Sequence, residues 1–297
     1  MDRSRNPRQA FASLVLACAL VWLGPVAAQV ERLAEGTYLY RSGAQRSLFL
    51  VGDEGVIVTD PVNADAAVAY RAAIAELTDA PVRYVVYSHY HWDRVSGGRI
   101  FRDEGATFVA QARCARRFAD NPNPAVVAPD ITFDDSYRVS VGNRSLELFY
   151  FGPSHGDCLT VFLARPANLL QVVDLVNPPR AAFPADPNVP YIRPHNLRQF
   201  FSAVERLIGD EGIVQIVASA APGPIRAPAS IVGEQARFWH EVYTAVDHAI
   251  EQGNVGIDSF VRMKTVDLSR FENFAGYSES GLRFVMRRIS GWHDMGR

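Results

Sequence analysis

In the stretch V-V-Y-S-H-Y-H-W-D-R-V-S-G-G, residues 85–98, an apolar run is followed by a polar turn. Residues 82–88 are nearly all apolar, which predicts a strand buried on both faces of a sheet. His89, His91 and Asp93 follow at every second position, and alternate side chains of an extended segment point to the same side. Imidazole nitrogens and carboxylate oxygens are ligands that zinc accepts. The stretch therefore predicts half of a metal site at the end of a buried strand.

Two more potential ligands stand at the ends of apolar runs further along the chain. His155 lies in F-G-P-S-H-G-D-C, between two expected strands, and Asp174 ends the apolar part of L-L-Q-V-V-D-L-V. A buried carboxylate at a strand end is costly unless it is paired or bound to a cation. Taken alone, Asp174 is also compatible with a turn or cap residue.

The periodicity of the rest of the chain predicts two β-rich blocks, each followed by helices. The expected strands are residues 37–41, 47–51, 56–59, 82–88, 107–110, 137–141, 146–151, 160–163, 169–173 and 213–218. The expected helices are residues 65–77, 95–102, 112–119, 197–208 and 229–252, followed by a mostly helical region to Arg297. This order predicts an α/β fold with strands inside and helices outside. Residues 29–297 are expected to form a single domain with a helical C-terminal region.

Three blocks in this order, S-H-Y-H-W-D-R-V-S-G-G, G-P-S-H and V-V-D, resemble the motifs of the metallo-β-lactamase superfamily. The preceding V-G-D-E-G-V-I-V-T-D-P, which contains Asp60, resembles the opening hairpin of that family. The likeness covers about residues 36–232. It implies a four-layer αβ/βα sandwich with the metals at one edge of two packed sheets.

The resemblance also implies which residues bind metal. His89, His91 and His155 would hold a first metal ion, Asp174 would be the carboxylate that bridges two metals, and Asp93 would bind a second.

Two departures weaken the second metal site. The family's usual Asp-His pair is replaced by Asp93-Arg94, as in one zinc β-lactamase subclass. The family's last histidine is missing from V-A-S-A-A-P-G-P-I, residues 217–225, where Ala221 or Pro222 takes its place. Two carboxylates without an imidazole make a poor zinc site, so we expect one zinc ion. Two ions remain possible if His195 substitutes for the missing ligand.

The implied activity is hydrolysis by zinc-activated water. A zinc ion with three histidine ligands and an open position lowers the pKa of its bound water to about 7. Asp93 would orient or deprotonate the water, and Arg94 would steady Asp93 or a substrate anion. The expected substrates are small-molecule esters, thioesters, lactones or amides. Arg180 and Arg193, in a proline-rich segment with His195, could meet a substrate carboxylate, although plain exposure explains them slightly better.

Two other functions fit the same residues. A chain that has lost second-site ligands can be a non-catalytic, metal-binding accessory protein. Alternatively, His89, His155 and Asp174 would make the two-histidine, one-carboxylate set of mononuclear iron oxygenases, which would make the protein an Fe²⁺-dependent sulfur dioxygenase. His91 favours zinc over iron.

Residues 1–28 have the pattern of a secretory signal peptide. Arginines precede an apolar stretch that ends in small residues, which predicts cleavage near Ala28. An uncleaved anchor and a lipid attached at Cys18 are the alternatives. Only one of the 30 basic residues is a lysine, Lys264, which is typical of a GC-rich bacterial genome. The expected location is therefore the bacterial periplasm or the medium, with no stable membrane insertion after cleavage.

Composition and cysteine content limit the partners further. The net charge of −2, without a basic patch, gives no indication of nucleic-acid binding. The secreted form and motif spacing resemble periplasmic metallohydrolases associated with quinoprotein or sulfur-oxidation systems, so a periplasmic protein partner is possible. Cys114 and Cys158 could form a disulfide in such a compartment, but their spacing alone does not decide this.

Overall fold

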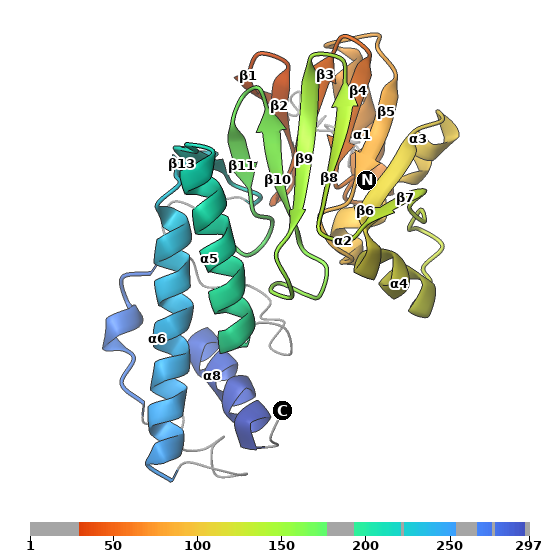
Figure 1. The fold of residues 1–297 in the computed structure, drawn as a ribbon. Coiled ribbons are helices and arrows are strands. Elements are labelled where there is room, and N and C mark those ends of the chain that lie inside the picture. The colour runs from red at the N-terminus through yellow and green to blue at the C-terminus, as the bar shows by residue number, and fades with distance from the viewer. Residues whose placement is uncertain (1–29, 177–192, 221–222, 254–265, 275–276, 295–297) are drawn as a thin grey trace, which may run out of the picture.

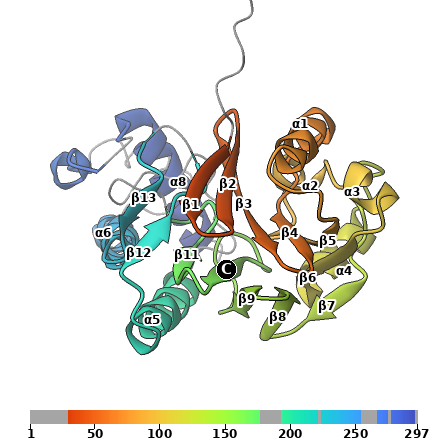
Figure 2. The same ribbon diagram turned by 90° about the horizontal axis from the view of Figure 1, so that it is seen from above.

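The computed structural model describes residues 30–176, 193–220, 223–253, 266–274 and 277–294. In this part of the chain two β-sheets face each other, and helices cover the outer face of each (Figure 1, Figure 2). The predicted α/β sandwich is confirmed.

The first sheet has seven strands in sequence order. They are β1 (Val30–Ala34), β2 (Thr37–Ser42), β3 (Gln45–Gly52), β4 (Gly55–Thr59), β5 (Val82–Val86), β6 (Thr107–Gln111) and β7 (Ile131–Phe133). The hairpins from β1 to β4 pair antiparallel. The strands from β4 to β7 pair parallel, and helices connect most of them.

The second sheet has six strands in the order β13-β12-β11-β10-β9-β8. They are β8 (Ser136–Val141), β9 (Arg144–Tyr150), β10 (Thr160–Arg165), β11 (Leu169–Gln171), β12 (Gln215–Val217) and β13 (Arg226–Pro228). All pairs are antiparallel except β11 with β12.

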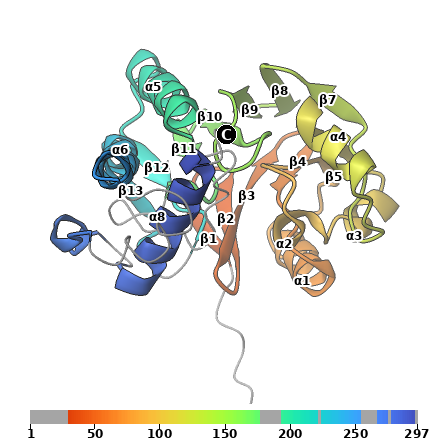
Figure 3. The ribbon, with the colours of Figure 1, turned by 90° about the horizontal axis from the view of Figure 1, so that it is seen from below.

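The helices form the two outer layers. On the first sheet lie α1 (Ala64–Ala75), α2 (Trp92–Val95), α3 (Arg99–Asp103) and α4 (Ala112–Asp120). Against the second sheet lie α5 (Pro194–Asp210), α6 (Ile231–Glu251) and α8 (Glu279–Asp294), with a 3₁₀ turn at Ser269–Phe271. Figure 3 shows the two helical layers on opposite sides of the sheets.

Strand alternation explains the layers. In β3, Leu48 and Leu50 belong to the core between the two sheets, whereas Phe49 packs in the core under α1. In β4, Ile57 faces the inner core and Val58 faces the helices. Because successive side chains of a strand point to opposite faces, each of these apolar runs fills two cores at once.

The structure corrects the predicted elements in two respects. Strands β1, β7 and β13 were not predicted, and the helix expected over residues 95–102 is instead the two short helices α2 and α3. Ser96, Gly97 and Gly98 separate them, because Ser96 N–H donates to the carbonyl oxygen of Val62 (3.1 Å) and ties the chain to the segment before α1.

The predicted signal peptide lies outside the described residues. Among the residues that are described, no helix is both long and apolar enough to span a membrane.

Candidate metal centre

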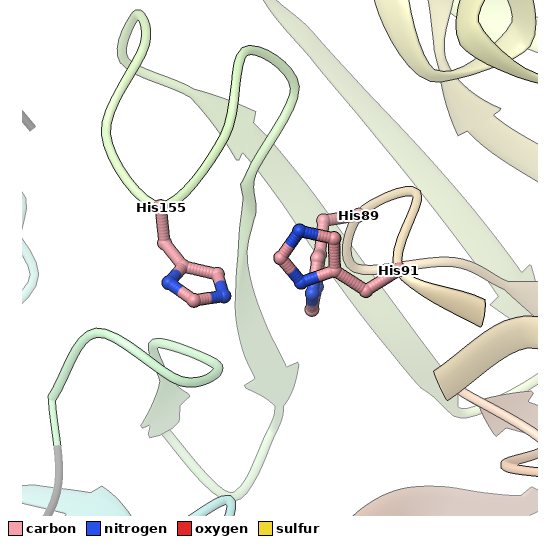
Figure 4. A group of neighbouring side chains, drawn as sticks. All are labelled: His89, His91 and His155. Atoms are coloured by element: carbon pink, nitrogen blue, oxygen red, sulfur yellow. The ribbon is translucent and has the colours of Figure 1, made fainter. Parts of the chain in front are cut away.

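Three histidines from two loops meet at one end of the sheets. His89 follows β5 by three residues, and His91 directly precedes helix α2, with an extended backbone (φ −68°, ψ 131°). His155 lies in the loop between β9 and β10. Figure 4 shows the three rings turned toward a common point.

The three side chains are close enough for one ion to bind all of them. One ligand nitrogen from each of the three residues lies within 4.8 Å of the other two. The ring centroids are 4.5 Å apart for His89 and His91, 5.1 Å for His89 and His155, and 4.9 Å for His91 and His155. Three histidine imidazoles are the protein ligands of many zinc sites.

His89 is prepared for metal binding by its surroundings. Its side chain is fully buried, and its Nε2 has no hydrogen-bond partner in the described structure. Its Nδ1 lies 2.8 Å from the hydroxyl of Ser88, which can accept the Nδ1 proton and leave Nε2 as the lone-pair donor. Burial, then the neighbouring His155 and His91, lowers the pKa of His89 well below its ordinary value. A neutral imidazole with an unpartnered buried nitrogen fits a metal ligand.

Asp174 lies beside the histidines, and Arg94 holds it there. Its Oδ2 is 3.5 Å from Nε2 of His89 and 3.9 Å from Nε2 of His155. Arg94 Nε donates to Asp174 Oδ2 (3.1 Å), and Nη2 forms an ion pair with Oδ1. Burial alone would lower the pKa of Arg94, but Asp174 outweighs it and the pKa is raised. A fully ionised guanidinium therefore faces the carboxylate.

Asp93 is not part of the histidine group, although the sequence pattern predicted it. Its side chain is exposed, and its Oδ2 accepts a hydrogen bond from Gln45 Nε2 (2.7 Å). The alternation of side chains holds only in an extended backbone, and helix α2 begins at Trp92, one residue earlier. The extended alternation therefore does not carry on to Asp93. Arg94 forms its ion pair with Asp174, and the charge of Asp93 adds to the raised pKa of Arg94.

The residues proposed for substrate binding are only partly described. Arg180 lies outside the described residues. Arg193 precedes α5 and is exposed, and His195 is exposed in the first turn of that helix. Within the described part of the chain, His195 does not join the metal-binding group.

Three further residues support the site, and of these the sequence had indicated only Asp60, through the resemblance of its segment to the family's opening hairpin. Asp60, one residue beyond β4, accepts the backbone N–H of Ser88 at its Oδ1 (2.8 Å), next to His89. Burial raises the pKa of Asp60 to about 7, opposed by Arg94 and the Ser88 N–H. The hydroxyl oxygen of Ser219, after β12, accepts a hydrogen bond from the backbone N–H of Asp174 (3.0 Å). Gln45 and Ser219 are ordinary polar residues, and only the folded chain brings them here.

Cys114 and Cys158 form a disulfide, which the sequence left open. Cys114 in α4 is bonded to Cys158, and both are fully buried in the core beneath the helices. The bond attaches the segment that follows His155 to the helical layer.

Two facing sheets between helical layers, with a histidine group where the strands end, define an αβ/βα sandwich with a candidate metal site. The family model of the metallo-beta-lactamase superfamily matches residues 41–212, more than half of the chain. The chain belongs to this superfamily.

Solved structures support the fold. A metallo-beta-lactamase from Pontibacter korlensis is 18% identical, with a TM-score of 0.62 over 71% of this chain and 98% of that one. DIM-1 metallo-beta-lactamase is 13% identical, with a TM-score of 0.60 over 71% of this chain and 96% of that one. At these identities the likeness concerns the fold alone.

One curated relative is similar in sequence. The 2,4-dinitroanisole O-demethylase subunit alpha of Nocardioides sp. (strain JS1661) is 26% identical over 155 residues. The aligned region covers 51% of this chain and 45% of that protein, so the chain spans less than half the length of this relative.

Proposed function

We propose that this protein is a zinc-dependent hydrolase with one metal ion, held by His89, His91 and His155. The observation that carries the proposal is the convergence of three imidazoles around the buried Nε2 of His89, which makes no hydrogen bond. A zinc ion on three histidines with an open position makes a water nucleophile available near neutral pH.

Asp174 is the best-positioned acid–base group for this reaction. Its Oδ2 lies within 4 Å of Nε2 of both His89 and His155, so it can accept a proton from a water molecule in the group. Arg94 orients the carboxylate through its paired hydrogen bonds. In this proposal Asp174, and not Asp93, orients or deprotonates the water. The sequence alone predicts this role for Asp93.

The alternatives have less support. In a two-histidine, one-carboxylate iron site, Asp174 would have to bind the metal while both its oxygens contact Arg94. His91 would then stand unused within the ligand group. A non-catalytic accessory protein has no need of an aligned carboxylate beside the histidines, but only an activity assay separates it from an enzyme.

The substrate class is an ester, thioester, lactone or amide. The name of the Nocardioides relative adds an aromatic methyl ether to this set, because that protein acts on 2,4-dinitroanisole. A screen should therefore include 2,4-dinitroanisole beside acyl substrates and a β-lactam.

We also propose that the protein works in the bacterial periplasm or outside the cell, together with a protein partner there. The N-terminal pattern and the Cys114–Cys158 disulfide support this location, since disulfides persist in oxidising compartments. Fractionation of the source bacterium with an antibody against the chain tests it.

The test of the proposed function is to measure metal content and hydrolysis together. Purified protein loaded with zinc and desalted should retain metal and cleave at least one substrate of the screen. Chelation, His89→Ala and His155→Ala should abolish both. His248→Ala, an exposed histidine on α6, is the matched control and should change neither. Tight iron binding with oxygen uptake on a persulfide would favour the dioxygenase, and metal without any turnover would favour the accessory protein.

A further inference from the structure

Arg94 is a charged side chain in an almost fully buried position. It is 2% exposed, and its guanidinium contacts both oxygens of Asp174, through Nε (3.1 Å) and Nη2. Nη1 and Nη2 also lie 3.3 Å and 3.4 Å from the carbonyl oxygen of Ser219. A planar guanidinium matches a carboxylate in this forked arrangement better than any other side chain. The carboxylate beside the histidine group therefore already has a cation.

The second acidic residue near the group is also engaged. Nε2 of Gln45 donates to the Oδ2 and to the backbone oxygen of Asp93, both at 2.7 Å. The same segment of β3 is fixed in turn, because Arg46 N–H donates to the carbonyl oxygen of Ser219 (2.9 Å). Asp93 is therefore held at its exposed position by Gln45 of β3, and β3 is itself bonded to Ser219.

We propose that the Arg94 guanidinium takes the place of a second metal ion beside Asp174, so that the protein binds a single metal ion. Arg94 is then a positioning residue, which fixes Asp174 against the histidine group with a permanent charge instead of an exchangeable one. The inference rests on the proposed metal-dependent function.

Two physical reasons keep a second metal ion from binding at Asp174. A divalent ion at Asp174 would lie within a few ångströms of the guanidinium charge, which repels it in a poorly solvated site. Arg94 cannot move away to admit the ion, because it would leave a buried charge without its partner.

The first test uses the unaltered full chain. Metal-free protein is titrated with zinc, desalted and analysed for metal per chain, and the titration is repeated with cobalt, whose visible spectrum reports the ligands. One ion per chain is expected with either metal. Two tightly held ions would overturn the inference and the single-ion count, while leaving metal-dependent hydrolysis at the histidine group intact. No bound metal would overturn both.

The second test replaces Arg94, the cation that pairs with Asp174. Arg94→His places an imidazole beside Asp174 and removes the permanent charge, so metal content should rise from one to two ions per chain. Arg94→Lys keeps the charge and should remain at one. Arg99→His adds a histidine at an exposed position of α3 and is the matched control, also at one.

The variants are compared by circular dichroism before metal analysis. One ion in Arg94→His, or two in Arg94→Lys, would overturn the inference. If Arg94→His does not fold, the stoichiometries of the unaltered chain and of Arg94→Lys still decide it.

Discussion

Cys114 in helix α4 is joined by a disulfide to Cys158, which follows the metal-site residue His155 by three positions. His155 has no regular secondary structure of its own to hold it, since it lies in the loop between β9 and β10. The disulfide and the buried position of Cys158 fix one end of this loop against the helical layer. Stability and metal binding are therefore linked through one covalent bond.

Removing the disulfide should lower the free energy of unfolding and weaken metal binding. The bond closes a loop with a sequence separation of 44 residues. Loop-closure entropy for this length predicts a loss of about 4 kcal/mol in Cys114→Ala/Cys158→Ala. Urea unfolding of the metal-free proteins measures the loss, and zinc titration should show a weaker dissociation constant in the variant.

Because the disulfide is buried, its resistance to reduction in the folded protein is a control for this prediction. Because both cysteines are fully buried, mild reductant should leave the native protein unchanged and open the bond only in urea. Ready reduction of the folded protein, or unaltered zinc affinity in the double variant, would show that the bond does not position His155.

Asp93→Asn and Asp174→Asn should have very different effects on hydrolysis. Asp174→Asn removes the carboxylate beside His89, so the rate at saturating zinc should fall by about 10²–10⁴-fold. Asp93→Asn alters an exposed contact with Gln45 and removes a minor charge interaction with Arg94, so the rate should stay within a few-fold of the unaltered protein. Rates measured on the best substrate of the screen decide between the two carboxylates.

Loss of Asp174 should also affect stability, which must be separated from its chemical role. Arg94 would be left as a buried charge without its partner, at a cost of roughly 3–5 kcal/mol. Rates are therefore compared under conditions in which circular dichroism shows the variant to be folded. Equal losses of activity in both variants would contradict the assignment to Asp174.

Much of the fold could be predicted from the sequence because its signals are local. The apolar run before His89 is a strand, and the long amphipathic segments are α5 and α6. The strands that were not predicted are short or lie at sheet edges, as β7 and β13 do with three residues each. Their conformation is set by pairing with β6 and β12, which a local pattern does not contain.

For the site, the sequence could predict the residues that would bind the metal, but not the residues that pair with them. His89, His91 and His155 stand out because histidines are rare at the ends of buried strands. The pairing of Arg94 with Asp174 spans 80 residues, and that of Gln45 with Asp93 spans 48, so neither leaves a pattern in the sequence. Asp93 was misplaced because a period of two was extended across the start of a helix.

Asp60 should make the stability of the metal-free protein depend on pH. Its buried carboxyl has a pKa of about 7 in the fold against 3.8 in a model compound, so the folded state binds the proton more tightly. The stabilisation is complete below the unfolded pKa and is lost as pH rises through the folded pKa, by up to about 4 kcal/mol. Arg94, Asp174 and Tyr70 face the group and stay unchanged in Asp60→Asn.

The measurement compares unfolding free energies of the unaltered protein and Asp60→Asn from about pH 5 to pH 8, where most other carboxyls are already ionised. The asparagine keeps an acceptor for the Ser88 N–H and does not titrate. The stability of the unaltered protein relative to this variant should therefore fall with rising pH. A constant difference would show that Asp60 does not carry the proton.

Gly97→Ala should destabilise the protein, because the break between α2 and α3 is packed against backbone. A Cβ at Gly97 would lie 2.5 Å from the carbonyl oxygen of Asn63 and also collide with that of Pro61. Neither oxygen can rotate aside as a side chain would, so we expect a loss of about 1–3 kcal/mol in urea unfolding. Gly209→Ala is the matched control: it lies in α5 with open space around it and should stabilise the chain by about 0.5–1 kcal/mol. Equal stabilities of the two variants would mean that Gly97 ends α2 for some reason other than close packing.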